Sequence, residues 1–205
     1  MLIDLSHPIR TAMPVYPGDT ETKLEHAKQF KKDGYNNHLL TINMHAGTHI
    51  DGPMHLLDTD TRINEFPVDR FIGPGCLLDA RGQSVVDAKP EYEAMIQPDD
   101  IVIVLTGHGK QYGSPGYFDH YPVLTESFAE LMVRKQVKMV GLDTPSPDHY
   151  PFEVHQILFR EQIFLIENLA NAEKLLDAGP FEVIALPLHI DADSSVARVV
   201  ARSLL

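Results

Sequence analysis

The sequence predicts a single α/β domain, residues 1–205, with a mixed central sheet and flanking helices. A length of 205 residues fits one domain. Over the second half of the chain, short apolar runs bounded by Gly, Pro or Asp alternate with helical patterns, as they do in α/β domains. Each apolar run suits a strand of a sheet that is covered on both faces.

The individual elements follow from these patterns. The expected strands are residues 1–6, 38–45, 74–80, 99–107, 137–143, 163–167 and 181–188, of which residues 38–45 are expected to be only partly buried. The expected helices are residues 90–97, 126–136, 155–162 and 168–179. Ser127 and Glu130 have the spacing of a capping box, and Gly179 closes the last helix. Residues 13–20 form a loop, because their prolines and Gly18 disfavour regular structure, and residues 194–205 fit either a strand or a helix.

Composition excludes several classes of partner and location. The net charge of −12 argues against a nucleic acid or an anionic membrane, since each would need a basic face. No apolar run approaches membrane-spanning length, and the N-terminus has neither the basic nor the apolar region of a signal peptide. Cys76 is the only cysteine and lies in an apolar run. We therefore expect a buried structural thiol and a reducing, cytoplasmic location.

Residues 45–55, HAGTHIDGPMH, concentrate groups that bind metals. The first two histidines are four apart and would share one face of a helix. Gly47 and the Gly-Pro pair at 52–53 disfavour a helix interior, however. In an extended chain the odd-numbered side chains point to one side. We expect a strand that ends near Met44 or His45 and runs into a tight loop gathering four side chains: His45, His49, Asp51 and His55.

This density of imidazole and carboxylate groups favours a metal site over a set of unrelated histidines. Both groups suit Zn²⁺ or Mn²⁺. Two histidines and one aspartate leave a coordination position open for water, as catalytic sites do. A structural zinc site would more often recruit thiolates, and the only cysteine lies elsewhere.

The segment H-x-G-T-H-x-D-x-P-x-H resembles the signature of the cyclase-type metal-dependent hydrolases, a family that includes bacterial kynurenine formamidase and isatin hydrolase. Further segments resemble other blocks of that family in the same order: residues 15–20, 140–148, 155–169 and 185–195. The resemblance covers nearly the whole chain. It implies a cyclase-like fold and a homodimer or higher homo-oligomer, with loops of one subunit near the site of another.

The resemblance also implies roles for individual residues. His45, His49 and Asp51 match the ligands of a first metal, and Asp51 would also bridge to a second where two are bound. His155 matches a second-metal ligand, and Glu167 matches a carboxylate that touches both metals. His55 matches the catalytic acid/base. Tyr16 lies where the formamidases carry a tryptophan that contacts the substrate.

Two of these residues also have structural interpretations. Glu167 ends an apolar strand, where a carboxylate is costly unless it is paired or bound to metal. It could instead begin the following helix, where the helix dipole favours negative charge. His155 could be an ordinary histidine at a helix end.

The chain departs from the family pattern at three positions. Tyr16 replaces the tryptophan, His108 stands where we expect an aromatic residue, and Asp191 stands where the family often has glycine. None of the three belongs to the metal set. They therefore bear on the substrate more than on the chemistry.

Three functions follow as hypotheses. The first is hydrolysis of a small aryl formamide or amide, with N-formylkynurenine as the substrate and kynurenine and formate as products. It would use one or two Zn²⁺ ions per chain, or Mn²⁺, to activate water, with His55 as the acid/base. The second is hydrolysis of a cyclic amide or lactone such as isatin. The third is a metal-stabilised binding protein without turnover, for which a fourth titratable group such as His55 would be unnecessary.

Overall fold

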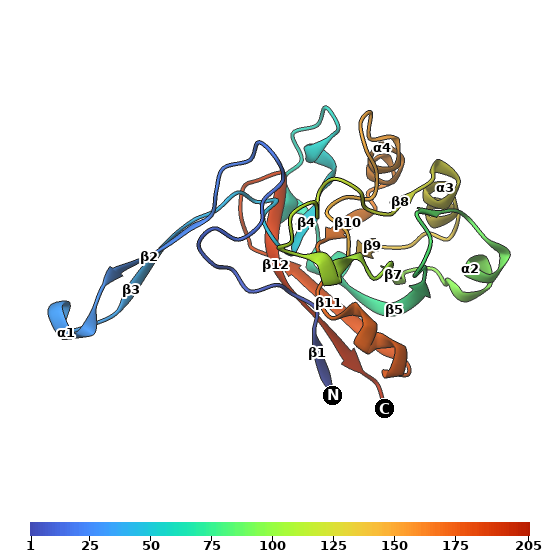
Figure 1. Cartoon of the computed structure of the whole chain (residues 1–205). Helices are drawn as coiled ribbons and strands as arrows, with labels where there is room; N and C mark the ends of the chain where they lie inside the picture. The colour runs from blue at the N-terminus through green and yellow to red at the C-terminus, as the bar shows by residue number, and fades with distance from the viewer.

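A closed, mixed sheet organises the molecule (Figure 1). The computed structural model describes residues 1–205, and the main sheet has the order β1-β12-β11-β5-β7-β9-β10-β4. Because β4 also pairs with β12, the strands from β12 round to β4 close into a ring. Strands β5, β7, β9 and β10 run parallel, and the other pairs in this sheet are antiparallel. The predicted α/β class and mixed sheet are confirmed.

The main sheet comprises β1 (Leu2–Asp4), β4 (His49–Asp51), β5 (Ile72–Asp79), β7 (Ile101–Leu105), β9 (Met139–Leu142), β10 (Phe164–Glu167), β11 (Phe181–Pro187) and β12 (Ser194–Ser203). Two small sheets pair β2 (Lys23–Lys28) with β3 (Asn37–Thr41) and β6 (Val85–Val86) with β8 (Val123–Leu124). The α-helices are α1 (Phe30–Asp33), α2 (Pro90–Met95), α3 (Glu126–Arg134) and α4 (Glu153–Arg160). None of them is both long and apolar enough to cross a bilayer.

The ambiguous C-terminal segment is a strand, and it closes the ring. Residues 194–196 of β12 pair with β4, and residues 197–203 pair with β11. One long strand therefore joins the two ends of the sheet. The edge of β4 that an open sheet would expose is paired instead, and the short strand β1 keeps one unpaired edge.

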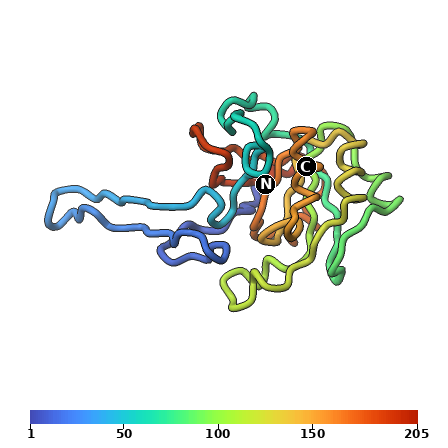
Figure 2. The backbone as a smooth tube through the Cα atoms, turned by 90° about the horizontal axis from the view of Figure 1, so that it is seen from above, coloured from blue at the N-terminus to red at the C-terminus, as the bar shows by residue number.

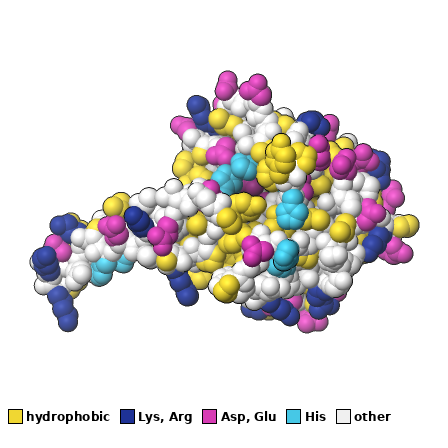
Figure 3. All heavy atoms as spheres, turned by 45° about the horizontal axis from the view of Figure 1, so that its top comes forward, with side chains coloured by type: hydrophobic (Ala, Val, Ile, Leu, Met, Phe, Trp, Pro, Cys, Tyr) yellow, Lys and Arg dark blue, Asp and Glu magenta, His cyan; other side chains and the backbone are white.

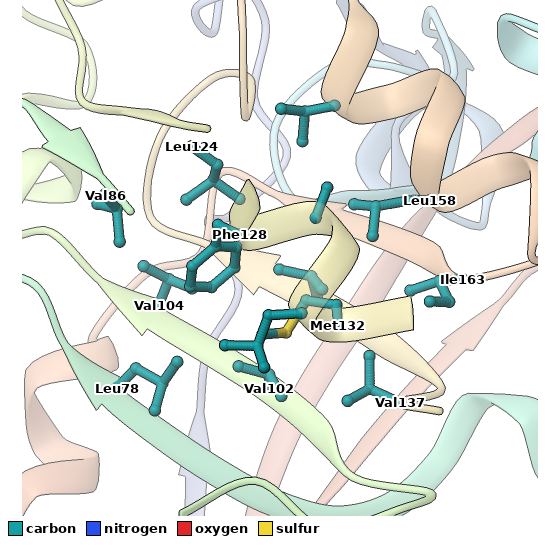
Figure 4. Close-up of a cluster of buried hydrophobic side chains, with 14 of the residues drawn as sticks. Leu78, Val86, Val102, Val104, Leu124, Phe128, Met132, Val137, Leu158 and Ile163 are labelled. Carbon is teal, nitrogen blue, oxygen red and sulfur yellow. The ribbon is translucent and has the colours of Figure 1, made fainter. Parts of the chain in front are cut away.

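Helices α2, α3 and α4 lie along one side of the body, rather than on both faces of an open sheet, whereas the short α1 lies outside the body between β2 and β3 (Figure 1). Helices α2, α3 and α4 cover the outer face of the parallel strands, where Phe128 and Met132 of α3 pack on Val102 and Val104 of β7 (Figure 4). The inner face needs no helix, because a second apolar cluster, which includes Ile103, fills the ring. Parallel strands thus remain buried on both faces, as their sequence requires.

Two helix predictions are wrong in detail. Helix α3 is capped by Thr125, whose Oγ1 accepts a hydrogen bond from the backbone N–H of Phe128 at 3.2 Å. Ser127 does not form the predicted capping box with Glu130, because its hydroxyl bonds to the Asp87 carboxylate. The predicted helix over 168–179 is shorter and tighter, a 3₁₀ segment at Ala172–Asp177.

Strands β2 and β3 form a long arm that projects from the body (Figures 1 and 2). Every residue of both strands is exposed. The prediction of a partly buried strand over 38–45 is therefore wrong: the strand ends at Thr41, and it pairs only with β2 outside the main sheet. Neither face of this hairpin is covered by another element of the chain.

Candidate metal centre and active site

Strand register brings three of the predicted ligands to one face of the sheet. His49 and Asp51 alternate with Ile50 on β4, and Ile50 points into the apolar interior of the ring. Glu167 lies directly opposite His49 on the antiparallel strand β10. Directly opposed residues share a face. All three side chains are buried, and they point toward the outer, helix-covered side.

The loop before β4 explains the G-T-H motif. Gly47 has φ +66°, and a Cβ there would collide with the terminal methyl of Met13. The carbonyl of Gly47 accepts a hydrogen bond from His49 Nδ1 at 2.8 Å. Thr48 donates its hydroxyl to the carbonyl of Asn168 at 2.7 Å, which ties the loop to the residue after Glu167. The predicted loop thus begins earlier than expected, after Thr41, and His49 and Asp51 belong to a strand rather than to the loop.

Helix α4 supplies His155 from the opposite side. Its Nδ1 lies 2.6 Å from Asp148 Oδ1, and Asp148 Oδ2 accepts the backbone N–H of Val154 at 2.7 Å. Asp148 therefore caps the helix and orients the imidazole at the same time. His155 Nε2 faces Glu167 Oε1 at 3.4 Å.

The five predicted ligands form two groups that share Asp51. His45, His49 and Asp51 make one group, and Asp51, His155 and Glu167 make the other, with the ligand atoms of each group within 4.8 Å of one another. Asp51 Oδ1 is 2.9 Å from His45 Nδ1 and 3.3 Å from His49 Nε2.

The orientation of the histidines fits bound cations. Each imidazole makes one aligned hydrogen bond through the ring nitrogen that faces away from the candidate metal groups: His45 Nε2 to Asp193, His49 Nδ1 to Gly47 and His155 Nδ1 to Asp148. The other ring nitrogen of each histidine faces a carboxylate but is not aligned for a hydrogen bond. His49 Nε2 and Asp51 Oδ1 are fully buried and have no hydrogen-bond partner. Unpartnered buried polar atoms are costly, and histidine ligands characteristically use their second nitrogen in this way.

The pKa values of His45 and His155 are raised, as expected for a site that attracts cations. Burial alone lowers the pKa of His45, but the carboxylates of Asp51 and Asp193 outweigh it and raise the pKa to about 10. Burial likewise opposes the charged form of His155, whose pKa Asp148 and Glu167 raise to about 9. The same anionic field that holds these protons attracts a divalent cation, which competes with them for the nitrogens.

His55 lies beside these two groups, in the 3₁₀ turn Pro53–His55. Its side chain is 31% exposed, so solvent and a small ligand reach it. Nδ1 lies 3.4 Å from Asp193 Oδ2, the oxygen that also accepts from His45 Nε2 at 2.9 Å. A third group of candidate ligands thus exists, formed by His45, His55 and Asp193, but there Asp193 is already engaged by His45.

Sequence reasoning missed Asp148 and Asp193. Asp148 had a detectable signal, because an aspartate shortly before a helix often caps its first turn. The only sequence signal for Asp193 was its position within residues 185–195, a segment that resembles a block of the family. Asp193 is held near His55 by a backbone hydrogen bond, in which the N–H of Gly52 donates to the carbonyl of Asp193 at 3.2 Å. A glycine is needed at position 52, because a Cβ there would lie 2.8 Å from the same carbonyl oxygen.

The site opens into a cavity of about 250 Å³. Its walls include Tyr16, Phe118 and Phe152, and its floor includes His155 and Glu167. Tyr16 packs edge-on against Phe118, with ring centroids 5.7 Å apart. The molecular surface in Figure 3 shows histidine side chains beside hydrophobic and acidic ones on one face of the body.

The other two departures from the family pattern do not line this cavity. His108 is buried, and its Nε2 lies 2.8 Å from the carbonyl of Tyr117. Asp191 is exposed and accepts a hydrogen bond from Asn64 at 2.8 Å. Both belong to loops outside the cavity, so of the three departures only Tyr16 can touch a ligand there.

Comparison with known proteins decides the family. The family described as "Putative cyclase" matches residues 3–149, more than half of the chain. This chain belongs to the cyclase family. The resemblance noted in the sequence is confirmed, and with it the prediction of a hydrolase related to kynurenine formamidase.

Individual relatives match over almost the full length. The kynurenine formamidase of Bacillus thuringiensis (strain Al Hakam) is 30% identical over 206 residues, covering 98% of this chain and 96% of the relative. Isatin hydrolase A from Labrenzia aggregata has a TM-score of 0.86 at 24% identity, covering 98% and 93% of the two chains. A protein described as a potential metal-dependent hydrolase with cyclase activity has a TM-score of 0.79 at 24% identity, covering 98% and 96%.

Proposed function

We propose that this cyclase-family chain, acting as one domain over residues 1–205, hydrolyses a small aryl formamide or amide. N-formylkynurenine is the proposed substrate, and kynurenine and formate are the products. The observation that carries the proposal is the convergence of five candidate ligands, four of them buried and His45 partly buried, at the base of an aromatic-walled cavity, with His55 beside them. The names of the relatives, kynurenine formamidases at 30% identity, support the choice of substrate.

We propose that His45, His49 and Asp51 hold one cation and that Asp51, His155 and Glu167 hold a second. Zn²⁺ is the proposed ion, in one or two copies per chain, and Mn²⁺ is the alternative. Imidazole and carboxylate ligands suit both ions. Bound there, such an ion would polarise the substrate carbonyl and would lower the pKa of a bound water molecule.

His55 then moves the protons of the reaction. Asp193 faces its Nδ1 at 3.4 Å, which favours the tautomer with the proton on Nδ1 and the lone pair on Nε2. The imidazole can take a proton from the water that attacks the formyl carbon. It can then give that proton to the aryl nitrogen as the C–N bond breaks, so that formate and the free arylamine leave.

The direct test is turnover by protein loaded with Zn²⁺ or Mn²⁺. We expect N-formylkynurenine to yield kynurenine and formate in equal amounts, measured by chromatography. A protein that holds its metals but converts no formamide would refute the proposed activity.

Hydrolysis of a cyclic amide or lactone such as isatin remains the second candidate. It needs the same water activation and the same proton transfers, and the cavity of about 250 Å³ admits a bicyclic ring. A single ring-opened product, with no formate released, would distinguish this activity. A binding protein without turnover is the third candidate, and the effect of replacing His55 distinguishes it from both enzymes.

Tyr16 is the proposed aryl contact. Its ring lines the cavity and packs on Phe118, so we expect aryl formamides to be hydrolysed faster than aliphatic ones. Tyr16→Ala should reduce this preference by about fivefold to tenfold in kcat/KM, and Tyr16→Phe, which keeps the ring, should preserve it. Equal rates on both substrate types in the unmodified protein would show that Tyr16 only anchors its loop.

His155 tests the number of metals. The second group loses its only imidazole in His155→Ala, so the metal content should fall from about two ions towards one per chain. Elemental analysis of protein exchanged into metal-free buffer measures this. If the unmodified chain holds one ion and the substitution changes neither content nor rate, the site uses a single metal.

We further propose a homodimer or higher homo-oligomer, located in the cytoplasm. The projecting arm exposes large apolar side chains, and an isolated two-stranded hairpin is at best marginally stable in water; these side chains are Leu24, Phe30, Tyr35, Leu39 and Leu40. A second copy of the chain could cover them. The single free thiol, Cys76, suits a reducing compartment. Sedimentation at monomer mass, or recovery of the protein outside the cytoplasm, would contradict these proposals.

A further inference from the structure

The wall of the cavity carries a carboxylate that has no partner. Asp19 lines the same cavity as His55 and Glu167 and is partly buried. No salt bridge in the structure includes it. It belongs to none of the three candidate metal groups. Its negative charge is therefore available to a ligand.

A tight turn fixes Asp19 next to the aromatic wall. The backbone N–H of Asp19 donates to the carbonyl of Tyr16 at 3.0 Å, and Gly18 between them has φ +100°. Pro17 and Gly18 occupy the positions that a type II turn favours for these two residues. The turn thus holds the Tyr16 ring and the Asp19 carboxylate together on one side of the cavity.

Apart from the histidines, the charged side chains that line the cavity are all carboxylates. Its lining residues include no lysine and no arginine. The other two lining carboxylates, Asp51 and Glu167, belong to the proposed metal groups, whose cations would neutralise them. Asp19 is therefore the one lining carboxylate that lies outside the proposed metal groups. The aromatic rings of Tyr16 and Phe118 on the same wall also attract a cationic ligand through their π faces.

We propose that Asp19 is a specificity-determining residue that binds an ammonium group of the substrate. This inference rests on the proposed function and narrows its substrate class to aryl formamides with an amine-bearing side chain. With its histidines engaged by the proposed metals, the cavity offers a substrate carboxylate no lysine or arginine to pair with. The pocket therefore recognises the ammonium group of an amino-acid substrate rather than its carboxylate.

Four formamides with one aryl ketone core separate these contributions. N-formylkynurenine carries both charges, N-formylkynuramine only the ammonium, 4-(2-formamidophenyl)-4-oxobutanoic acid only the carboxylate, and 1-(2-formamidophenyl)propan-1-one neither. With the metal-loaded protein we expect the two ammonium substrates to show the higher kcat/KM, through a lower KM. Asp19→Asn should reduce the ratio of kcat/KM for N-formylkynuramine to that for the neutral ketone by about fivefold, the upper end for a solvent-exposed ion pair. Glu21→Gln, an exposed carboxylate outside the cavity, should leave the ratio unchanged.

A binding measurement with the deformylated products tests the ammonium site without depending on hydrolysis of the formamide. Kynuramine should bind more tightly than 1-(2-aminophenyl)propan-1-one in calorimetry, and Asp19→Asn should remove the difference. If no formamide is hydrolysed but this difference appears, the proposed activity fails and the ammonium site stands. If the neutral and cationic compounds react and bind alike, or if Asp19→Asn leaves their ratio unchanged, the ammonium site is wrong.

Discussion

His55→Ala should lower kcat on N-formylkynurenine by on the order of 10²- to 10⁴-fold, the usual contribution of a positioned acid/base. The five proposed ligands remain in this variant, so its metal content should stay close to that of the unmodified protein. Steady-state kinetics and elemental analysis of the same preparation measure both quantities.

Chemical rescue sharpens this prediction. Because the His55 side chain is 31% exposed, free imidazole can enter the space left by the substitution and should restore part of the rate. His120→Ala, which removes an exposed histidine outside the cavity, should behave like the unmodified protein. Loss of metal from His55→Ala would make His55 a ligand, and a near-normal rate would assign the proton transfer to another group such as Glu167.

Asp51→Asn should have a larger effect, because Asp51 is the one residue shared by both proposed metal groups. The amide keeps the shape of the side chain but removes its charge. Metal content should fall to near zero at micromolar metal. The rate should fall on the order of 10⁴-fold or more, since no other group in the cavity could lower the pKa of water from about 15.7 to about 7.

Thermal unfolding separates this loss from misfolding. Asp51 Oδ1 has no aligned hydrogen bond, so the metal-free variant with the isosteric amide should still fold cooperatively, with a lower melting temperature because His45 loses a charge partner. Asp60→Asn, at an exposed carboxylate outside the cavity, is the matched control. A variant Asp51→Asn that is folded and retains both ions and activity would show that the cations lie elsewhere.

The part of the site that local sequence could predict is the part that strand geometry fixes. His49 and Asp51 share a face because side chains alternate along an extended chain, which needs no knowledge of the fold. Glu167 could be suspected because it ends an apolar strand, but its place opposite His49 depends on the pairing of β10 with β4. His45 could be suspected from the density of histidines in residues 45–55, whereas the roles of His55 and His155 came from family resemblance; all three remain proposals.

Long-range contacts account for what the sequence did not predict. Asp193 meets His45 and His55 only because β12 closes the ring against β4, and residues 194–205 fitted a strand and a helix equally well. The arm was misjudged because its apolar residues resemble those of a half-buried strand, whereas nothing in the chain covers them. Ser127 lost its predicted capping role to a contact with Asp87, which is distant in sequence.

Elemental analysis of protein purified without metal-affinity steps tests the metal centre most directly when it is combined with activity. The account predicts one or two equivalents of Zn²⁺ or Mn²⁺ per chain, and a chelator should abolish hydrolysis of N-formylkynurenine until the ion is returned. Full activity in protein shown to be free of metal would contradict it.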